Sequence, residues 1–97
     1  MSDQRFTRIT ATGQVQTIAG GSTAIGPARI TYIQVEGVAN SNIKLYDGTD
    51  DSGALVFEGN CGTEGLDIYV PGSGIRCRTG IYLDLTNTTS VTIGYTG

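Results

Sequence analysis

The chain has 97 residues, among them nine acidic side chains, six basic ones and no histidine. This length fits one domain with a single modest core. The lack of histidine excludes Ser-His-Asp and Cys-His nucleophile systems and removes the commonest metal ligand. Glycine supplies 15 residues, about twice its usual share, and together with abundant threonine it indicates many short strands joined by turns.

The charge pattern disfavours nucleic acid as a partner. Between residues 37 and 67 the carboxylates are opposed by Lys44 alone, and no basic cluster occurs elsewhere. Phosphate contacts made by basic side chains supply most of the affinity for nucleic acid. We therefore expect no nucleic-acid binding.

Neither a secretion signal nor a membrane segment is expected. The first residues are polar with no apolar stretch behind them, and no apolar run approaches the length of a membrane span. Without export, Cys61 and Cys77 are predicted to be reduced thiols rather than a disulfide.

Residues 1–25 differ from the rest because apolar side chains are thinly spread among Thr, Gln and Gly. The pattern predicts weak strands near residues 5–12 and 14–18, followed by a flexible link at 20–22. Such a segment is either an edge strand or an arm that orders against a partner. The predicted organisation is therefore an N-terminal arm or edge strand over 1–25 and a β-sandwich domain over 26–97.

Gly26-Pro27 predicts a break, and a long strand follows over residues 28–38. Its apolar side chains do not keep to one face, since Ile33 and Val35 alternate with Tyr32 while Ile30 falls on the Tyr32 side. This mixed pattern indicates either a central strand covered on both faces or a bulge that switches the pleat. A turn is predicted at residues 40–42.

The strongest local signal is a hairpin over residues 42–58, N-I-K-L-Y-D-G-T-D-D-S-G-A-L-V-F-E. Ile43 and Leu45 alternate with Lys44 and Tyr46, which predicts one dry and one wet face. The Asp-Gly pair at 47–48 favours a turn, and residues 55–57 are predicted to return as the partner strand.

The remaining strands alternate in the same way. Leu66, Ile68 and Val70 form one predicted inner face, Ile81, Leu83 and Leu85 a second, and Val91, Ile93 and Tyr95 a third. Turns are predicted at 71–74, 79–80 and 87–90. Turn signals recurring roughly every eight to twelve residues predict an all-β fold, a single antiparallel β-sandwich or jelly-roll-like domain of about seven to eight short strands.

Candidates for catalysis or metal binding are weak. A carboxylate pair for glycoside hydrolysis could be drawn from Glu58, Asp67 and Asp84, but both Asp side chains fall on outward strand positions, where solvated acids are ordinary. Asp47, Thr49, Asp51 and Glu58 have some of the spacing of a calcium loop, yet Ser52 stands where that loop needs glycine and strands flank it. We expect no enzyme activity, no cofactor and no bound metal.

The two thiols are expected to be inert. Cys77 shares the face of Ile75 and is predicted to be a small buried side chain. Cys61 lies in a loop, but no basic neighbour is available to lower its pKa.

Tyrosines form the remaining candidate site. A sugar-binding face could be lined by Tyr32, Tyr46, Tyr69, Tyr82 and Tyr95. Three of them, Tyr46, Tyr69 and Tyr82, fall on predicted polar faces, where a flat platform would need them. Half-exposed sheets and subunit contacts favour tyrosine as well, so the three alternatives stay open.

Three stretches of the chain, taken together and in this order, resemble the sequences of a group of small virion proteins of tailed bacteriophages. These stretches are I-K-L-Y-D-G-T-D-D-S-G-A-L-V-F, then V-P-G-S-G-I-R-C-R-T-G-I-Y-L-D-L-T, and finally S-V-T-I-G-Y. The resemblance covers about residues 26–96 and leaves 1–25 unmatched. It implies a compact β-sandwich attached to the outside of a phage head as a decoration or cement protein, or alternatively a receptor- or glycan-binding knob or fibre domain.

The expected partner is then the major capsid protein or another virion protein, bound by a homo-oligomer, with a trimer favoured. The capsid surface is the expected location, after assembly in the host cytoplasm. The N-terminal segment is the candidate capsid or subunit contact, because Arg5 and Arg8 contrast with the acidic body and Phe6 and Ile9 are available as apolar anchors.

Overall fold

A computed structural model describes residues 4–17 and 23–96. This part of the chain contains seven strands, all paired antiparallel, and no helix, which confirms the predicted all-β class. The strands are β1 (Arg5–Ile9), β2 (Gly13–Gln14), β3 (Ala28–Asp47), β4 (Ala54–Asn60), β5 (Leu66–Tyr69), β6 (Ile75–Cys77) and β7 (Ile81–Thr96).

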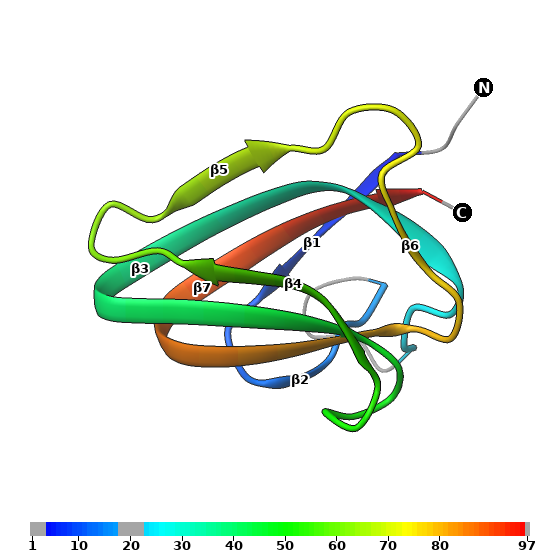
Figure 1. Ribbon diagram of the computed structural model, residues 1–97, viewed down its shortest axis with the longest axis horizontal. Helices are drawn as coiled ribbons and strands as arrows, with labels where there is room; N and C mark the ends of the chain where they lie inside the picture. The colour runs from blue at the N-terminus through cyan, green and yellow to red at the C-terminus, as the bar shows by residue number, and fades with distance from the viewer. Residues whose placement is uncertain (1–3, 18–22, 97) are drawn as a thin grey trace.

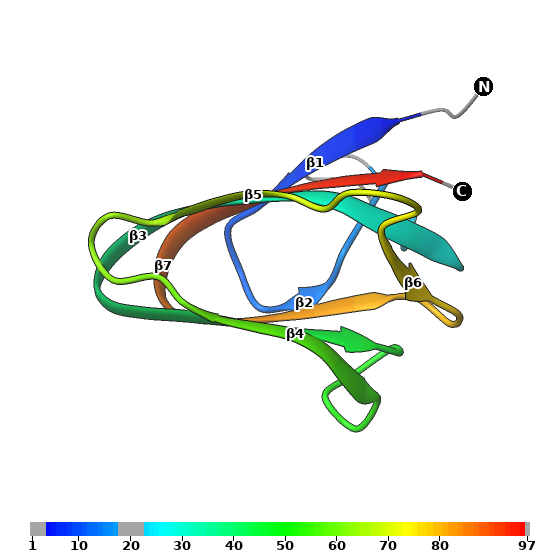
Figure 2. The same cartoon turned by 45° about the horizontal axis from the view of Figure 1, so that its top comes forward.

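The two layers of the domain arise from one sheet that folds over on itself. β3 and β7 pair along most of their lengths, from Arg29 opposite Thr96 to Asp47 opposite Ile81, and the pair bends in its middle (Figure 1). In the first layer, β1 and β5 flank the second half of β7 and the first half of β3. In the second layer, β2 and β4 flank the other halves of the same two strands (Figure 2).

The chain was predicted to reverse direction in turns at 40–42 and 87–90, and both predictions are wrong. The bend of β3 and β7 lies at these positions instead. Both segments remain inside long strands, so β3 and β7 are much longer than the predicted strands. Asn40 and Asn87 adopt positive φ angles of 63° and 51°, a conformation that asparagine tolerates better than most residues. The local signals therefore marked a sharp change of direction, while the chain continues in the same sheet.

A buried serine holds the bend. Ser41 is 2% exposed, and its hydroxyl accepts the Val38 N–H at 2.7 Å. The hydroxyl oxygen also lies 2.5 Å from the carbonyl oxygens of Val38 and Asn87, which compete for its single proton. Gly37 is needed beside it, because a Cβ there would lie 2.5 Å from the Ser41 hydroxyl oxygen. The side chain of Ser41 thus ties the bend of β3 to the bend of β7.

Alternation along the strands was predicted correctly. Ile43 and Leu45 are fully buried while Lys44 and Tyr46 are half-exposed, and β3 and β4 form the predicted hairpin. The mixed pattern in the first half of β3 results from a bulge, since the pairing with β7 shifts register between Ile30 and Tyr32. Of the two alternatives predicted for this strand, a strand covered on both faces or a bulge that switches the pleat, the structure shows the bulge.

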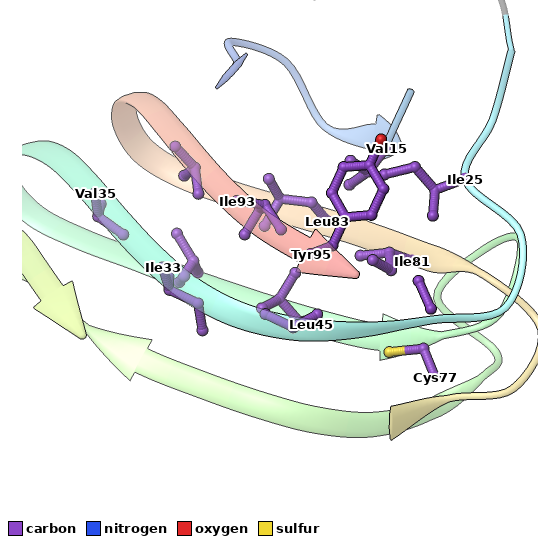
Figure 3. Packing of buried hydrophobic residues seen from close by; sticks show 14 of the residues in the cluster. Val15, Ile25, Ile33, Val35, Leu45, Cys77, Ile81, Leu83, Ile93 and Tyr95 are labelled. Carbon is purple, nitrogen blue, oxygen red and sulfur yellow. The ribbon is translucent and has the colours of Figure 1, made fainter. Parts of the chain in front are cut away.

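The core lies between the two layers and is built from their inner faces (Figure 3). Cys77 is 1% exposed and packs with the aliphatic side chains as predicted. Tyr95 is also buried, and its hydroxyl donates to the Thr17 carbonyl oxygen at 3.3 Å. The fully buried aliphatic side chains come from both layers and from the segment before β3: Val15, Ile30, Ile33, Ile43, Leu45, Ile81, Leu83, Val91 and Ile93.

The N-terminal segment takes part in this core. β1 pairs with β7 at the edge of the first layer, and β2 pairs with β7 in the second. Val15 and Ile25 are buried and are joined by a hydrogen bond from the Ile25 N–H to the Val15 carbonyl oxygen at 2.9 Å. The end of the second predicted strand, Ile18, and the predicted link at 20–22 lie outside the described residues.

Candidate interaction surface

The first layer presents an outer face made by neighbouring strands. Strand register aligns its side chains in two rows that cross β1, β7, β3 and β5. We call this the outer face, with a first row of Phe6, Gly94, Tyr32 and Tyr69 and a second row of Arg8, Thr92, Gln34 and Asp67.

The first row is largely aromatic and open to solvent. Phe6 is 56% exposed and Tyr69 is 69% exposed, which is unusual for side chains of this size. The rings of Phe6 and Tyr32 meet edge to face, with centroids 6.0 Å apart and planes at 79°. Gly94 makes this possible, because a Cβ at that position would lie 2.8 Å from both the Phe6 ring and the Tyr32 Cβ.

A polar contact fixes the Tyr32 side chain on this face. The Tyr32 hydroxyl donates a short hydrogen bond to an Asp67 carboxylate oxygen, which links β3 to β5. This bond and the nearby negative charge, together with partial desolvation, raise the pKa of Tyr32. Tyr32 thus stays a neutral donor, and the Asp67 carboxylate is held beside the aromatic row.

The four predicted contact residues lie on β1 in two different environments. Phe6 and Arg8 project from the outer face, where both are exposed. Arg5 is exposed at the start of the strand, whereas Ile9 is half-buried and packs against the core. β1 therefore presents Phe6 and the two arginines to solvent, while Ile9 anchors the strand to the sheet.

The tyrosines considered for a sugar-binding platform are divided between the two layers. Tyr46 and Tyr82 pair across β3 and β7 in the second layer, with ring centroids 6.2 Å apart, and Leu55 lies opposite Tyr46 on β4. Tyr69 lies in the first layer, with Tyr32 as its cross-strand neighbour. A single platform of Tyr46, Tyr69 and Tyr82, one of the alternatives that the sequence left open, does not form, because the fold of the sheet sends the two groups to opposite faces; Tyr95 is buried in the core.

The carboxylates considered for glycoside hydrolysis are divided in the same way. Glu58 and Asp84 lie on either side of Lys44 in cross-strand register on the second layer. Asp67 lies in the first layer and is bound to Tyr32. No two of the three acids are thus direct cross-strand neighbours: Lys44 lies between Glu58 and Asp84, and Asp67 lies on the other layer.

The loop considered for calcium uses its carboxylates for local structure. Asp47 accepts the N–H groups of Arg78 and Thr79, each at 2.8 Å, and that of Gly80 at 3.4 Å. These bonds lower the pKa of Asp47. Asp50 accepts hydrogen bonds from the Ser52 hydroxyl and from the Ser52 N–H, the latter at 2.9 Å, and these bonds lower the pKa of Asp50. Within residues 4–17 and 23–96, no group of three His, Cys, Asp or Glu side chains is arranged to hold a metal ion.

Both cysteines are buried free thiols. Burial raises the pKa of Cys61, and burial together with the Asp47 carboxylate raises the pKa of Cys77 to about 11. Since the thiolate is the reactive form, both side chains are suppressed as nucleophiles in the folded protein. Their predicted structural role agrees with their burial.

Sequence reasoning missed the combination of Tyr32, Asp67 and Gly94. These residues are distant in the chain and meet through strand register, which local alternation does not specify. Gly94 lies in the stretch that was predicted as the last strand, and it was given no role there. Its position inside a strand rich in β-branched residues is the signal that could have singled it out, because such a glycine often marks the close approach of a neighbouring group.

The described residues contain no helix with the length and apolar character needed to cross a membrane. Comparison of the chain with protein-family models, with curated proteins and with solved structures finds no match.

Proposed function

We propose that this protein is a non-enzymatic structural protein of a tailed-phage virion that decorates or cements the outside of the capsid. The observation that carries the proposal is the outer face, where Phe6, Tyr69 and the cation of Arg8 are exposed on paired strands of the sheet. Exposed aromatic and arginine side chains are the residue types that dominate protein contacts. The resemblance of residues 26–96 to small virion proteins supports the same assignment.

The proposed partner is a repeating lattice of major capsid protein, bound by a homo-oligomer that we take to be a trimer. One face of a 97-residue chain offers a modest contact area. Linked copies that bind neighbouring lattice sites reach an avidity far above that of one copy. A small adhesive face is therefore sufficient for stable attachment when it is repeated.

Co-sedimentation tests this proposal with two variants and a matched control. Purified protein is mixed with empty phage heads, and the bound fraction is measured after pelleting. Tyr69→Ala and Phe6→Ala are expected to weaken binding at least about tenfold, as truncation of a central aromatic side chain does at protein interfaces. Leu55→Ala is the control, because Leu55 is 51% exposed on the second layer.

One result would reject the proposed function, and another would reject the outer face as the capsid contact. One is that the unaltered protein stays in the supernatant at every concentration of heads. The other is that Leu55→Ala weakens pelleting while Tyr69→Ala and Phe6→Ala do not, which would move the contact to the second layer. Thermal unfolding of each variant shows whether any loss of binding comes from loss of the fold.

A glycan-binding knob or fibre domain is the second candidate. Tyr69 is favoured for this role because its exposed ring lies beside the Asp67 carboxylate that Tyr32 fixes. Sugar sites combine an aromatic surface with a few placed polar groups. A glycan array probed with the unaltered protein and with Tyr69→Ala tests it: a signal lost in the variant favours this candidate, and an empty array removes it.

A further inference from the structure

The first layer ends on both sides in a strand with an open edge. Within the described part of the chain, β1 pairs with β7 alone and β5 pairs with β3 alone. The two strands form opposite margins of the layer (Figures 1 and 2). An open edge carries unpaired main-chain N–H and C=O groups and is a template for pairing with another strand.

The main-chain groups that face outward can be assigned from the ladder. The Val70 N–H donates to the Thr31 carbonyl oxygen at 2.9 Å, so inward bonding alternates along β5 and leaves the main-chain groups of Asp67 and Tyr69 facing the open side. Continuing the same alternation across β3 and β7 leaves the main-chain groups of Phe6 and Arg8 facing outward from β1. Both edges thus offer two residues with free donors and acceptors at the same spacing.

The two edges are complementary in charge. β1 carries Arg8, and β5 carries Asp67 in the same row of the outer face. When β1 of one copy pairs with β5 of another so that each row of the outer face continues across the contact, Arg8 of one copy lies opposite Asp67 of the other. In that register the aromatic side chains of Phe6 and Tyr69 also become cross-strand neighbours, and such aromatic and opposite-charge pairs stabilise sheets.

The inner sides of the two edges match as well. The same register sets Ile9 opposite Leu66, both half-buried and packed against the core at opposite margins. Pairing would cover the apolar surface that each leaves exposed. Strand direction is also compatible, because β1, β7, β3 and β5 alternate in direction and the next β1 therefore meets β5 antiparallel.

We propose that β1 of one copy adds to the β5 edge of a second copy, with Phe6 opposite Tyr69 and Arg8 opposite Asp67. The contact is head-to-tail, so it generates a ring when the rotation between copies closes. It joins the outer faces of neighbouring copies into one wider surface. This inference deepens the proposed oligomeric state, but it is tested without capsids and can fail or succeed independently of capsid binding.

Charge reversal tests the contact by analytical ultracentrifugation across a concentration series. Arg8→Glu and Asp67→Arg each place like charges opposite one another, and each is expected to weaken association at least about tenfold. The double variant Arg8→Glu/Asp67→Arg restores the opposite charges and is expected to recover association. Glu58→Arg changes net charge as Asp67→Arg does, but on the second layer, and is expected to leave association unchanged.

Amide hydrogen exchange followed by NMR supplies a second readout. In the assembled protein, the amides of Phe6, Arg8, Asp67 and Tyr69 are expected to become protected, and dilution to the monomer should remove that protection. This measurement needs no substitution and holds even if a variant fails to fold. A protein that is monomeric at all concentrations, or an assembly that Asp67→Arg leaves intact, would overturn the proposal.

Discussion

Asp47 shows how a single carboxylate closes the turn between β6 and β7. It accepts three successive main-chain N–H groups, from Arg78, Thr79 and Gly80. Bonds to the charged form of a carboxylate are stronger than bonds between neutral groups. An acid that local sequence suggested as a calcium ligand is thus occupied in joining the end of β3 to the start of β7.

Asp47→Asn is expected to destabilise the fold by about 1 kcal/mol at neutral pH, which lowers the melting temperature by about 4–8 °C. The pKa of Asp47 lies below its ordinary value of 3.8, so its stabilising effect is complete above that value. The effect is lost as the pH falls through the lowered pKa, and the difference between the two proteins should shrink there.

Thermal melts at neutral and acidic pH measure both effects. Asp51→Asn is the matched control, since Asp51 is an exposed acid of the same loop. Equal melting temperatures of Asp47→Asn and the unaltered protein at neutral pH would contradict the assigned role of the carboxylate.

At the scale of elements, the bend in β3 and β7 produces a two-layered domain from a single sheet. It depends on the positive φ angles of Asn40 and Asn87 and on the buried hydroxyl of Ser41, which contacts both strands. Without the bend, the inner faces of the two layers could not enclose a common core.

Ser41→Ala is expected to lower the free energy of unfolding by about 1–3 kcal/mol, because the Val38 N–H loses its acceptor and the carbonyl groups of Val38 and Asn87 lose the one hydroxyl proton that they share. Urea unfolding followed by circular dichroism measures the change. Ser73→Ala, in the exposed turn after β5, is the control. A midpoint for Ser41→Ala equal to that of the control would show that the bend does not depend on this hydroxyl.

Local alternation was sufficient to predict which side chains of the strands face inward. Ile43, Leu45, Ile81 and Leu83 are buried as predicted because a period of two fixes their face wherever one side of a sheet is covered. The continuity of β3 through Asn40 could not be predicted. Asn and Ser favour a departure from extended backbone, but whether the chain then reverses or bends depends on which distant strand pairs with it.

The outer face was only partly predictable for the same reason. Arg5, Phe6, Arg8 and Ile9 were singled out from their composition, and three of the four are exposed on β1. The alignment of Phe6 with Tyr32 and Tyr69 depends on pairing between residues far apart in the chain. Strand order and register are properties of the whole sheet, so local sequence could not supply them.

At the scale of the whole molecule, the chain presents two faces of different character. The first layer carries the exposed aromatic row with Arg8 and Asp67, and the second carries Lys44 between Glu58 and Asp84 beside the Tyr46–Tyr82 pair. The proposed attachment uses the first layer, and the proposed self-association uses its two margins. Together they would build a multivalent adhesive surface from one small chain.

Electron cryo-microscopy of empty phage heads incubated with the purified protein tests this account most directly. The account predicts regular additional density on the outside of the shell, with the layer that carries Phe6 and Tyr69 turned toward the capsid and β1 of one copy beside β5 of the next. Bare heads at saturating protein concentration, or density that contacts the shell through the layer of Tyr46 and Tyr82, would contradict it.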